Sequence, residues 1–343
     1  MKIIEDLRTL LSIGMIIYAG YILFDHSLLA YLLIALAVTV FPFPKSKVGR
    51  IIRILITFSL VCADIAIYAG LIKDPLIRPN IREGEIRVHF IDVGQGDCQF
   101  IELPDGKSIL IDSGVNEYGP AVVRYIKNQG YRKIDILIAT HPHADHIGSM
   151  HTVVDELDIG SFYTVKLKQE QIPESYSVTS LNRSLSKKKI KTQYARRGDI
   201  LYTDGDNGIV FSCLSPADGL YFDDLNQYSM ITSLQYEHTR IIFTGDAGFQ
   251  AENQITGKGD LSTTVLKLGH HGSGDATGFR FLQETDPDIA VIQVGENDFE
   301  DPNVNLLTRL EERGTDVYRT DLEGTIIITM NNYEILSVET EKE

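Results

Sequence analysis

The sequence predicts an α/β fold with two β-sheets and helices packed outside them, preceded by an N-terminal bundle of about three transmembrane helices. Residues 1–73 contain three long apolar runs. In the remainder, strand-like runs dominate each half and helical segments lie between them. The chain has 343 residues, 43% hydrophobic and 23% charged, so it can bury a core. This composition excludes wholesale disorder, collagen-like repeats and a coiled coil.

The three apolar runs cover residues 9–24, 27–44 and 54–72. A membrane-spanning helix needs about 20 mostly apolar residues, within a range of roughly 17–25. The alternative, a buried helical core domain, would need a polar face to contact water, and these runs have none. Asp64, the one charge inside them, is expected to face another helix, because a charge facing lipid is costly.

The charges beside these runs predict the orientation of the chain in the membrane. The segment between the second and third runs, residues 45–53, carries four Lys or Arg residues, whereas the turn between the first two holds only Asp25 and His26. Basic flanks stay in the cytoplasm. We therefore expect a multi-pass protein in contact with the lipid bilayer, with everything after Ile72 outside the cytoplasm.

The rest of the chain is divided into a linker over residues 74–85, a folded domain over 86–335 and a C-terminal tail over 336–343. Pro75 and Pro79 mark the linker. A helix is expected from Pro120 to Gly130, with Pro at its start and Gly past its end. Further helices are expected from 147 onward and over 278–284 and 303–313. Strands are expected over 86–93, 98–103, 108–112, 134–139, 209–214, 230–236, 240–244, 264–268, 289–294 and 324–330. The basic run at 187–191 is interpreted as a solvated helix end or loop.

Charge and cysteine content narrow the function classes. The whole chain carries a net charge of −15, although residues 1–73 have an excess of basic residues. A strongly acidic domain is unlike a protein that coats nucleic acid, which needs a basic surface to displace counterions. Three cysteines are too few for a disulfide scaffold. The sequence leaves undecided whether Cys98 and Cys213 form a single disulfide bridge.

One heptad concentrates the chemistry. It reads Thr140-His141-Pro142-His143-Ala144-Asp145-His146 and follows a short apolar run of the buried-strand type. Imidazole nitrogens and carboxylates are good ligands for zinc, manganese or iron. Alternation along an extended chain places His141 and His143 on the same side. Asp145 and His146 can then face a second ion from the next turn.

Two later segments have the same character. Asp246 follows the apolar run 241–244, and His270-His271-Gly272-Ser273 follows the run 266–268. Taken singly, a carboxylate after a strand is usually a turn residue and a His pair is usually surface. With the heptad upstream, both segments are expected to join it, since a carboxylate can bridge two metal ions and another imidazole can complete a ligand set.

These motifs resemble the metallo-β-lactamase superfamily, whose signature is His-x-His-x-Asp-His, and in particular the hydrolase domain of competence proteins of the ComEC/Rec2 type. The resemblance runs from about Ile86 to Met330. Besides the heptad and the His270–Ser273 segment, the resemblance rests on Asp92-Val93-Gly94-Gln95-Gly96-Asp97, Leu110-Ile111-Asp112-Ser113-Gly114, Asn226 with Ser229, Thr244-Gly245-Asp246, Val294-Gly295 and Arg319-Thr320-Asp321 with Gly324. It implies an αββα sandwich with a two-metal site at one edge of the sheets.

The resemblance also implies two divalent ions, Zn²⁺ in first place and Mn²⁺ as the alternative. One ion is assigned to His141, His143 and one of His270 and His271. The other is assigned to Asp145 and His146, which are also the residues given to catalysis, with Asp246 bridging. Relatives commonly place a His where this chain has Asp301. Asp301 is therefore expected as a ligand of the second ion, or else one metal site is weakened.

The remaining site residues are expected around the ligands. Asp112 is expected to orient the heptad. A structural role and a functional role are both open for Asp92 and Asp97, which flank a Gly-rich turn. Asn226, Ser229 and Ser273 are candidates for substrate contact, with turn hydrogen bonding as the alternative for Asn226 and Ser229.

The resulting hypothesis is a membrane-anchored, two-metal hydrolase that uses a metal-activated water on a phosphodiester. It would be a phosphodiesterase or nuclease, with single- or double-stranded DNA as substrate. Two rivals stay open: a hydrolase of a cell-envelope phosphoester, and a degenerate metal-binding partner domain of a membrane complex. With only three expected spanning helices, the chain is not interpreted as a DNA importer. Its protein partners are not predicted.

Overall fold

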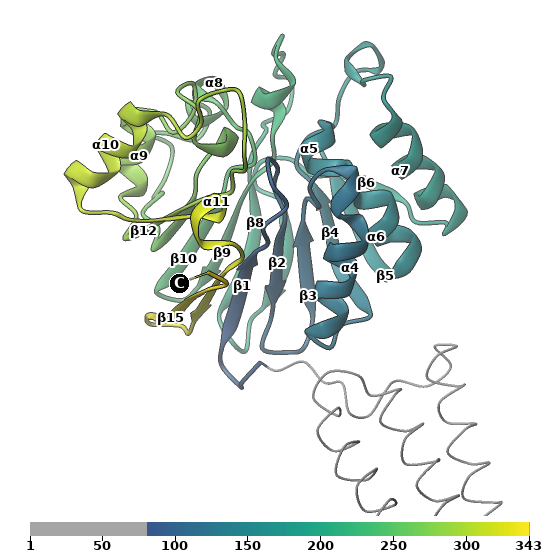
Figure 1. The fold of residues 1–343 in the computed structure, drawn as a ribbon, viewed down its shortest axis with the longest axis horizontal. Helices are drawn as coiled ribbons and strands as arrows, with labels where there is room; N and C mark the ends of the chain where they lie inside the picture. Colours follow the sequence, from purple (N-terminus) through teal and green to yellow (C-terminus); the bar gives the residue numbers. More distant parts are fainter. Residues whose placement is uncertain (1–80, 343) are drawn as a thin grey trace, which may run out of the picture. The chain divides into compact units, whose positions relative to one another are not determined.

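The computed structural model describes residues 81–342 (Figure 1). The three expected membrane spans, and the expected linker up to residue 80, lie outside this range. Among residues 81–342, no helix combines the length and the apolar character needed to cross a bilayer.

The first sheet has eight strands in the order β15-β14-β1-β2-β3-β4-β5-β6. Strands β3 to β6 run parallel to one another, and the other pairs are antiparallel. The strands are β1 (Ile86–Phe90), β2 (Gln99–Glu102), β3 (Ser108–Ile111), β4 (Lys133–Ala139), β5 (Asp158–Thr164), β6 (Thr192–Tyr194), β14 (Ile326–Met330) and β15 (Ile335–Thr340).

The second sheet has seven strands in the order β13-β12-β11-β10-β9-β8-β7. Strands β10 to β13 are parallel, and β7 to β10 are antiparallel. The strands are β7 (Ile200–Asp204), β8 (Ile209–Ser215), β9 (Ile231–Tyr236), β10 (Thr239–Phe243), β11 (Val265–Lys267), β12 (Ile289–Ile292) and β13 (Asp316–Arg319).

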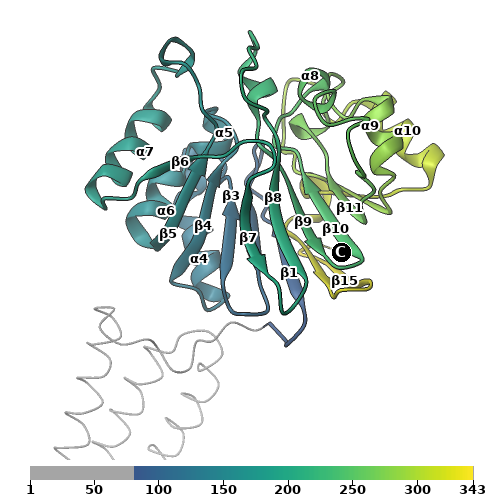
Figure 2. The same ribbon diagram turned by 180° about the vertical axis from the view of Figure 1, so that it is seen from behind.

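Helices cover the outer face of each sheet (Figures 1 and 2). On the first sheet they are α4 (Gly119–Asn128), α5 (Ala144–Ile147), α6 (Met150–Glu156) and α7 (Tyr176–Lys187). The second half carries α8 (Phe249–Glu252), α9 (Phe279–Thr285), α10 (Val304–Arg313) and α11 (Thr320–Glu323). The described domain is therefore a four-layered αββα sandwich, and the expectation of two sheets with helices outside is confirmed.

Three apolar clusters hold the layers together. The central cluster lies between the sheets and takes alternate residues of β1, namely Ile86, Val88 and Phe90, because successive side chains of a strand point to opposite faces. A second cluster packs α4, α6 and α7 on the first sheet, and a third packs α9 and α10 on the second. Cys213 belongs to the first cluster and Cys98 to the second, and both are free thiols. The Cys98–Cys213 bridge left open by the sequence is therefore not formed.

The ends of three strands converge at one edge of the sandwich. The heptad follows β4, Asp246 follows β10 and His270 follows β11. A backbone hydrogen bond joins two of these segments, since His270 N donates to Gly245 O at 3.1 Å. The heptad is held by Met230, just before β9, whose N donates to Thr140 O at 3.0 Å. The fold thus brings segments more than a hundred residues apart to one place.

Two expectations are corrected by the structure. Most of the expected tail over 336–343 forms β15, which pairs with β14 and packs Ile335 and Val338 against the central cluster. It is an edge strand, where its polar and charged side chains can stay in water. The helix expected from Ile147 instead begins at Ala144 and is split, as α5 ends at Ile147 and α6 starts at Met150.

Candidate metal centre

The backbone of the heptad is fixed by Asp112, which follows β3. Its Oδ1 accepts a hydrogen bond from Thr140 N at 2.9 Å, and its Oδ2 accepts one from Thr140 Oγ1 at 2.6 Å. His143 is the N-cap residue of α5 and has extended backbone angles. The chain therefore turns at His143, and the first turn of α5 presents Asp145 and His146.

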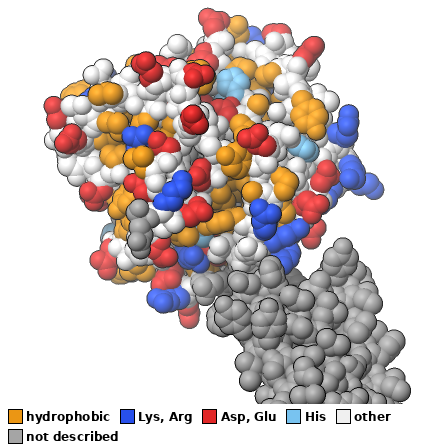
Figure 3. Space-filling view, viewed as in Figure 1, with side chains coloured by type: hydrophobic (Ala, Val, Ile, Leu, Met, Phe, Trp, Pro, Cys, Tyr) orange, Lys and Arg blue, Asp and Glu red, His pale blue; other side chains and the backbone are white. Residues whose placement is uncertain are grey.

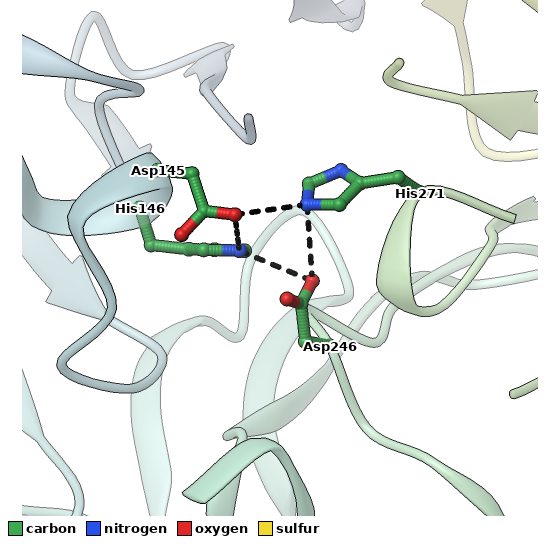
Figure 4. Close-up of side chains that lie close together, drawn as sticks. All are labelled: Asp145, His146, Asp246 and His271. Atoms are coloured by element: carbon green, nitrogen blue, oxygen red, sulfur yellow. Dashed lines mark hydrogen bonds and ion pairs between the residues drawn. The ribbon is translucent and has the colours of Figure 1, made fainter. Parts of the chain in front are cut away.

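Four donor side chains form the first group: Asp145, His146, Asp246 and His271 (Figure 4). Asp145 and His146 come from α5, whereas His271 reaches the same point from the second half of the sandwich. His146 Nε2 lies 3.1 Å from Asp246 Oδ1, and His271 Nε2 lies 3.3 Å from Asp145 Oδ2. One potential ligand atom of each residue lies within 4.8 Å of those of the others.

A second group shares Asp246 with the first and adds His141 and His143. His141 Nε2 lies 3.0 Å from His143 Nδ1 and 3.7 Å from Asp246 Oδ2. Asp246 therefore turns Oδ2 toward this group, while Oδ1 faces His146 and His271 at 3.1 and 3.7 Å. This division of one carboxylate between two donor groups is the arrangement of a bridging ligand.

Hydrogen bonds behind the ligands fix which imidazole nitrogen faces the centre. His146 Nδ1 lies 2.7 Å from Asp112 Oδ2, and His271 Nδ1 lies 2.9 Å from the backbone oxygen of Gln293. A nitrogen that donates to such an acceptor carries the proton, which leaves Nε2 with a free lone pair. Asp112 thus orients a ligand and stays out of the donor groups that share Asp246.

Opposite charges within the centre offset the free-energy cost of burying its ionisable side chains. Burial alone would raise the pKa of Asp246, but His146 and His271 beside it hold that pKa well below its usual range. Although burial would lower the pKa of His146, the carboxylates of Asp246, Asp112 and Asp145 raise it well above the ordinary value. By contrast, burial and the neighbouring His146 lower the pKa of His141. Because an imidazole must be neutral to bind a metal, a divalent cation at this centre would displace the second proton that these carboxylates favour on His146, and the ionised carboxylates would supply oxygen ligands.

Two buried atoms at the middle of the centre support a metal ion there. His146 Nε2 and Asp246 Oδ1 make no hydrogen bond to any group among residues 81–342, although they lie only 3.1 Å apart. Buried polar atoms normally have a partner. Two donor atoms that both point at a metal ion lie this close together without forming a hydrogen bond to each other. Nitrogen and carboxylate donors suit zinc, and the carboxylates also suit manganese.

His270 lies beside the two groups. Its Nδ1 is 3.0 Å from Asp275 Oδ1, its Nε2 is 3.2 Å from Asn226 Nδ2, and Nε2 is 4.0 Å from Asp246 Oδ2. Burial lowers its pKa, but the hydrogen bond to Asp275 and the charge of Asp246 raise it to about 9. His271 therefore completes the Asp145–His146 group, whereas the sequence had assigned one of the two histidines to the His141–His143 ion.

The other candidates fall at different distances from the centre. Ser229 Oγ is 3.2 Å from His141 Nδ1 and accepts a hydrogen bond from Asp246 N, so it supports both. Asp301 is half-buried and belongs to none of the donor groups found among residues 81–342, whereas His271 lies in the Asp145–His146 group. Asp92 accepts a hydrogen bond from Gly94 N and shapes the turn. Ser273 ends the short helix that holds the His pair.

Two residues near the metal centre, Gln293 and Lys267, were not predicted from the sequence. Gln293 supplies the backbone oxygen that fixes His271, and its side chain donates to the backbone oxygens of Ile91 and Cys98 at 2.9 and 3.0 Å. Lys267 is fully buried next to Asp97. The signal for Lys267 was a cation inside the apolar run 265–268, since a lysine is almost never fully buried unless it is paired.

Gly96→Ala is expected to weaken metal binding. A Cβ at this position would lie 2.4 Å from the backbone oxygen of Asp145, so α5 or the turn must move. We expect the affinity for the metal to fall roughly 10–100-fold, as for other changes behind the ligands. Isothermal titration of the metal-free chain measures this. Gly205→Ala is the control, since nothing lies within 4 Å of its Cβ; equal affinities of the two variants would contradict the tight contact.

His271 and Asp301 give opposite predictions for metal content. His271→Ala removes a donor of the first group, and we expect the chain to lose one ion after dialysis against a weak chelator. Asp301→Ala should keep the wild-type content, because its carboxylate lies outside the donor groups. A loss of one ion in Asp301→Ala, with full content in His271→Ala, would restore the ligand role that the sequence suggested for Asp301.

Comparison with known proteins agrees with this geometry. The sequence pattern of the Metallo-beta-lactamase superfamily matches residues 91–296, which include both donor groups. ComE operon protein 3 of Bacillus subtilis is 28% identical over 268 residues, covering 71% of this chain and 33% of that protein. Competence protein ComA of Neisseria gonorrhoeae is 27% identical, covering 73% of this chain and 33% of that protein.

A third relative extends the similarity over more of the chain. Recombination protein 2 of Haemophilus influenzae is 24% identical over 295 residues, covering 83% of this chain and again 33% of that protein. The chain thus matches about a third of the length of each of these curated relatives. The αββα fold, the shared carboxylate and the family match agree: the chain belongs to the metallo-beta-lactamase superfamily and resembles competence proteins of the ComEC/Rec2 type.

Proposed function

We propose that this protein is a two-metal hydrolase that cleaves phosphodiester bonds. The observation that carries the proposal is Asp246, whose two oxygens are divided between the His146–His271 side and the His141 side of the centre. Two adjacent divalent ions are the common device of phosphatases and nucleases. Bound at such a pair of sites, they polarise the scissile group and lower the pKa of water.

The side chains themselves decide how a substrate approaches. His141, His146, Asp246 and His271 are buried, whereas Asp145 and His143 are partly exposed. The centre is therefore open to solvent on the side of the heptad turn and closed behind by both sheets. The buried side holds the ligands rigidly, and the open side is where a phosphodiester and a water molecule would enter.

DNA is the substrate that we propose within the phosphodiester class. Among the curated relatives, one is named a competence protein, one a product of the ComE operon and one a recombination protein. On the face shown in Figure 3, basic side chains are interspersed with acidic ones among the described residues. With a net charge of −15, recognition would rest on the metal centre and a few local contacts instead of a broad basic surface.

The experiment is hydrolysis of a generic phosphodiester and of single- and double-stranded DNA by the metal-loaded full chain. His143→Ala removes a metal-donor side chain and should reduce turnover about 100-fold or more. Substitution of residues that only orient the ligands already lowers metal affinity or activity 10–100-fold. His238→Ala is the matched control, because His238 is exposed and stacks on Tyr333. Near wild-type turnover in His143→Ala would refute the metal-dependent mechanism. If the chain cleaves only cell-envelope phosphoesters, the proposed substrate changes from DNA to these esters. If it binds metal ions but hydrolyses nothing, the domain is a degenerate metal-binding domain.

We further propose that residues 1–73 anchor the chain in the membrane, with the domain outside the cytoplasm. The support is the pattern of apolar runs and basic flanks in the sequence. Protease added to intact spheroplasts should then reach the domain. If the domain is protected until the membrane is broken, the orientation is wrong and the substrate must be a cytoplasmic molecule.

A further inference from the structure

A buried ion pair lies directly behind the metal centre. Lys267 of β11 and Asp97 of the loop between β1 and β2 both have no exposed surface, and Lys267 Nζ lies 2.8 Å from Asp97 Oδ2. Lys267 belongs to the second sheet and Asp97 to a loop that connects two strands of the first, so the pair joins the two halves of the sandwich. Within residues 81–342, no other lysine is buried. Burying an ion pair costs free energy that an apolar pair of the same size would not cost, which suggests a role beyond packing.

The second oxygen of the Asp97 carboxylate faces a ligand. Asp97 Oδ1 lies 3.5 Å from His271 Nδ1, the nitrogen that also lies 2.9 Å from the backbone oxygen of Gln293. The opposite nitrogen, His271 Nε2, lies 3.3 Å from Asp145 Oδ2 and 3.7 Å from Asp246 Oδ1. A continuous series of contacts therefore runs from the ammonium of Lys267 through Asp97 to the donor group.

The backbone of Asp97 joins the other side of the same group. Its N–H donates to the backbone oxygen of Asp145 at 3.1 Å, and its own backbone oxygen accepts from Gly114 N at 2.8 Å. Lys267 Nζ in turn donates to the backbone oxygen of Leu268 at 2.9 Å, just before the His pair. Lys267 and Asp97 thus link the segment that carries Asp145 to the segment that carries His271.

We infer that Lys267 is a positioning residue of the metal centre: its ammonium holds the Asp97 carboxylate beside His271, so that Nε2 of His271 stays directed at Asp145 and Asp246. The inference rests on the proposed two-metal site but not on the identity of the substrate. Carboxylates behind metal-bound histidines fix ring orientation, and their loss typically costs 10–100-fold in metal affinity. Here the carboxylate itself needs a fixed cation, because it has no contact with water.

The test compares two variants of the full chain by isothermal titration with Zn²⁺ and with Mn²⁺. Lys267→Met removes the charge and leaves Asp97 buried without its cation, which also threatens folding. The double variant Lys267→Met with Asp97→Leu replaces the pair with apolar side chains and should keep the fold. Lys258→Met is the control, since Lys258 is exposed. Thermal unfolding of each variant, without metal, reports the structural effect separately.

We expect the double variant to unfold near the wild-type temperature and to bind one of its two ions 10–100-fold more weakly, with the other unchanged. Wild-type affinity for both ions in the double variant would overturn the inference, since the pair would then be structural only. Equal weakening of both ions in a folded variant would also overturn it. If the wild-type chain itself binds no ion, the proposed function fails. If the wild-type chain binds two ions and the double variant binds both with the same affinities, only the role of Lys267 fails.

Discussion

Asp246→Ala should abolish hydrolysis and empty both metal sites. Asp246 is the only residue that belongs to both donor groups sharing the centre in the described part of the chain, and it is 1% exposed. Its removal leaves His141 and His143 alone on one side, and it leaves three of four donors on the other. Substitution of residues that only orient the ligands already lowers metal affinity or activity 10–100-fold. We therefore expect the loss of a ligand shared by both sites to lower turnover more than about 100-fold.

Metal content and turnover of Asp246→Ala are measured on the same preparation. Asp246→Asn serves as a second variant, because it keeps the shape of the side chain and removes one ligand oxygen and the charge. Asp218→Ala is the control for a lost surface carboxylate, since Asp218 is exposed. Retention of two ions and of wild-type turnover in Asp246→Ala would show that the shared carboxylate does not bridge.

Phe243→Ala should produce the largest loss of stability. Phe243 is 1% exposed and lies in the central cluster between the sheets, with its ring centroid 6.2 Å from that of Phe90. Truncation of a buried Phe leaves a cavity and typically costs about 3–5 kcal/mol of unfolding free energy. Urea unfolding of the metal-free chain measures it, because bound metal would add its own stabilisation.

Phe279→Ala is the matched control for Phe243→Ala. Its side chain is 64% exposed at the start of α9, so the change should stay within about 0.5 kcal/mol. A loss below about 1 kcal/mol in Phe243→Ala would mean that the sheets are not packed as described. Such a result would also weaken the account of the metal centre, which depends on the two sheets meeting at one edge.

The sequence predicted the parts of the centre that are local in the chain. The heptad places four donors within six residues after a buried strand, and strand ends are where such donors gather. Asp112, expected behind the heptad, lies there with its Oδ2 2.7 Å from His146 Nδ1. The elements with a plain apolar pattern, such as β4 and α10, also lie close to their expected positions.

What the sequence did not predict depends on distant contacts. Both His270 and His271 have positive φ angles, 50° and 53°, and the direction of each ring is set by Asp275 and by Gln293. No local pattern distinguishes the two. Asp301 was expected as a ligand because relatives commonly place a His there; among residues 81–342 it belongs to none of the donor groups, and His271 is the histidine that lies beside Asp145.

For two of the elements that the sequence analysis did not include, α7 and β15, the physical reasons are plain. The face of α7 toward the first sheet carries Ser177, Ser180 and Ser184 beside Leu181 and Leu185, so its apolar periodicity is weak. Two of these serines have hydrogen-bond partners within the fold: Ser180 Oγ donates to Tyr176 O at 2.7 Å, and Ser184 Oγ donates to Asp155 Oδ2 at 3.1 Å. The strand β15 lies at a sheet edge, where half of its residues remain polar.

Phosphodiester turnover as a function of ions bound per chain tests whether the centre is a two-metal hydrolase. The full chain is stripped of metal, reloaded stepwise with Zn²⁺ or Mn²⁺, and assayed at each step for bound ions and for hydrolysis of a generic phosphodiester. We predict saturation at two ions per chain, with turnover that requires both donor groups to be filled. A folded chain that saturates at fewer than two ions, or that holds two ions and shows no turnover of any phosphodiester, would contradict the account.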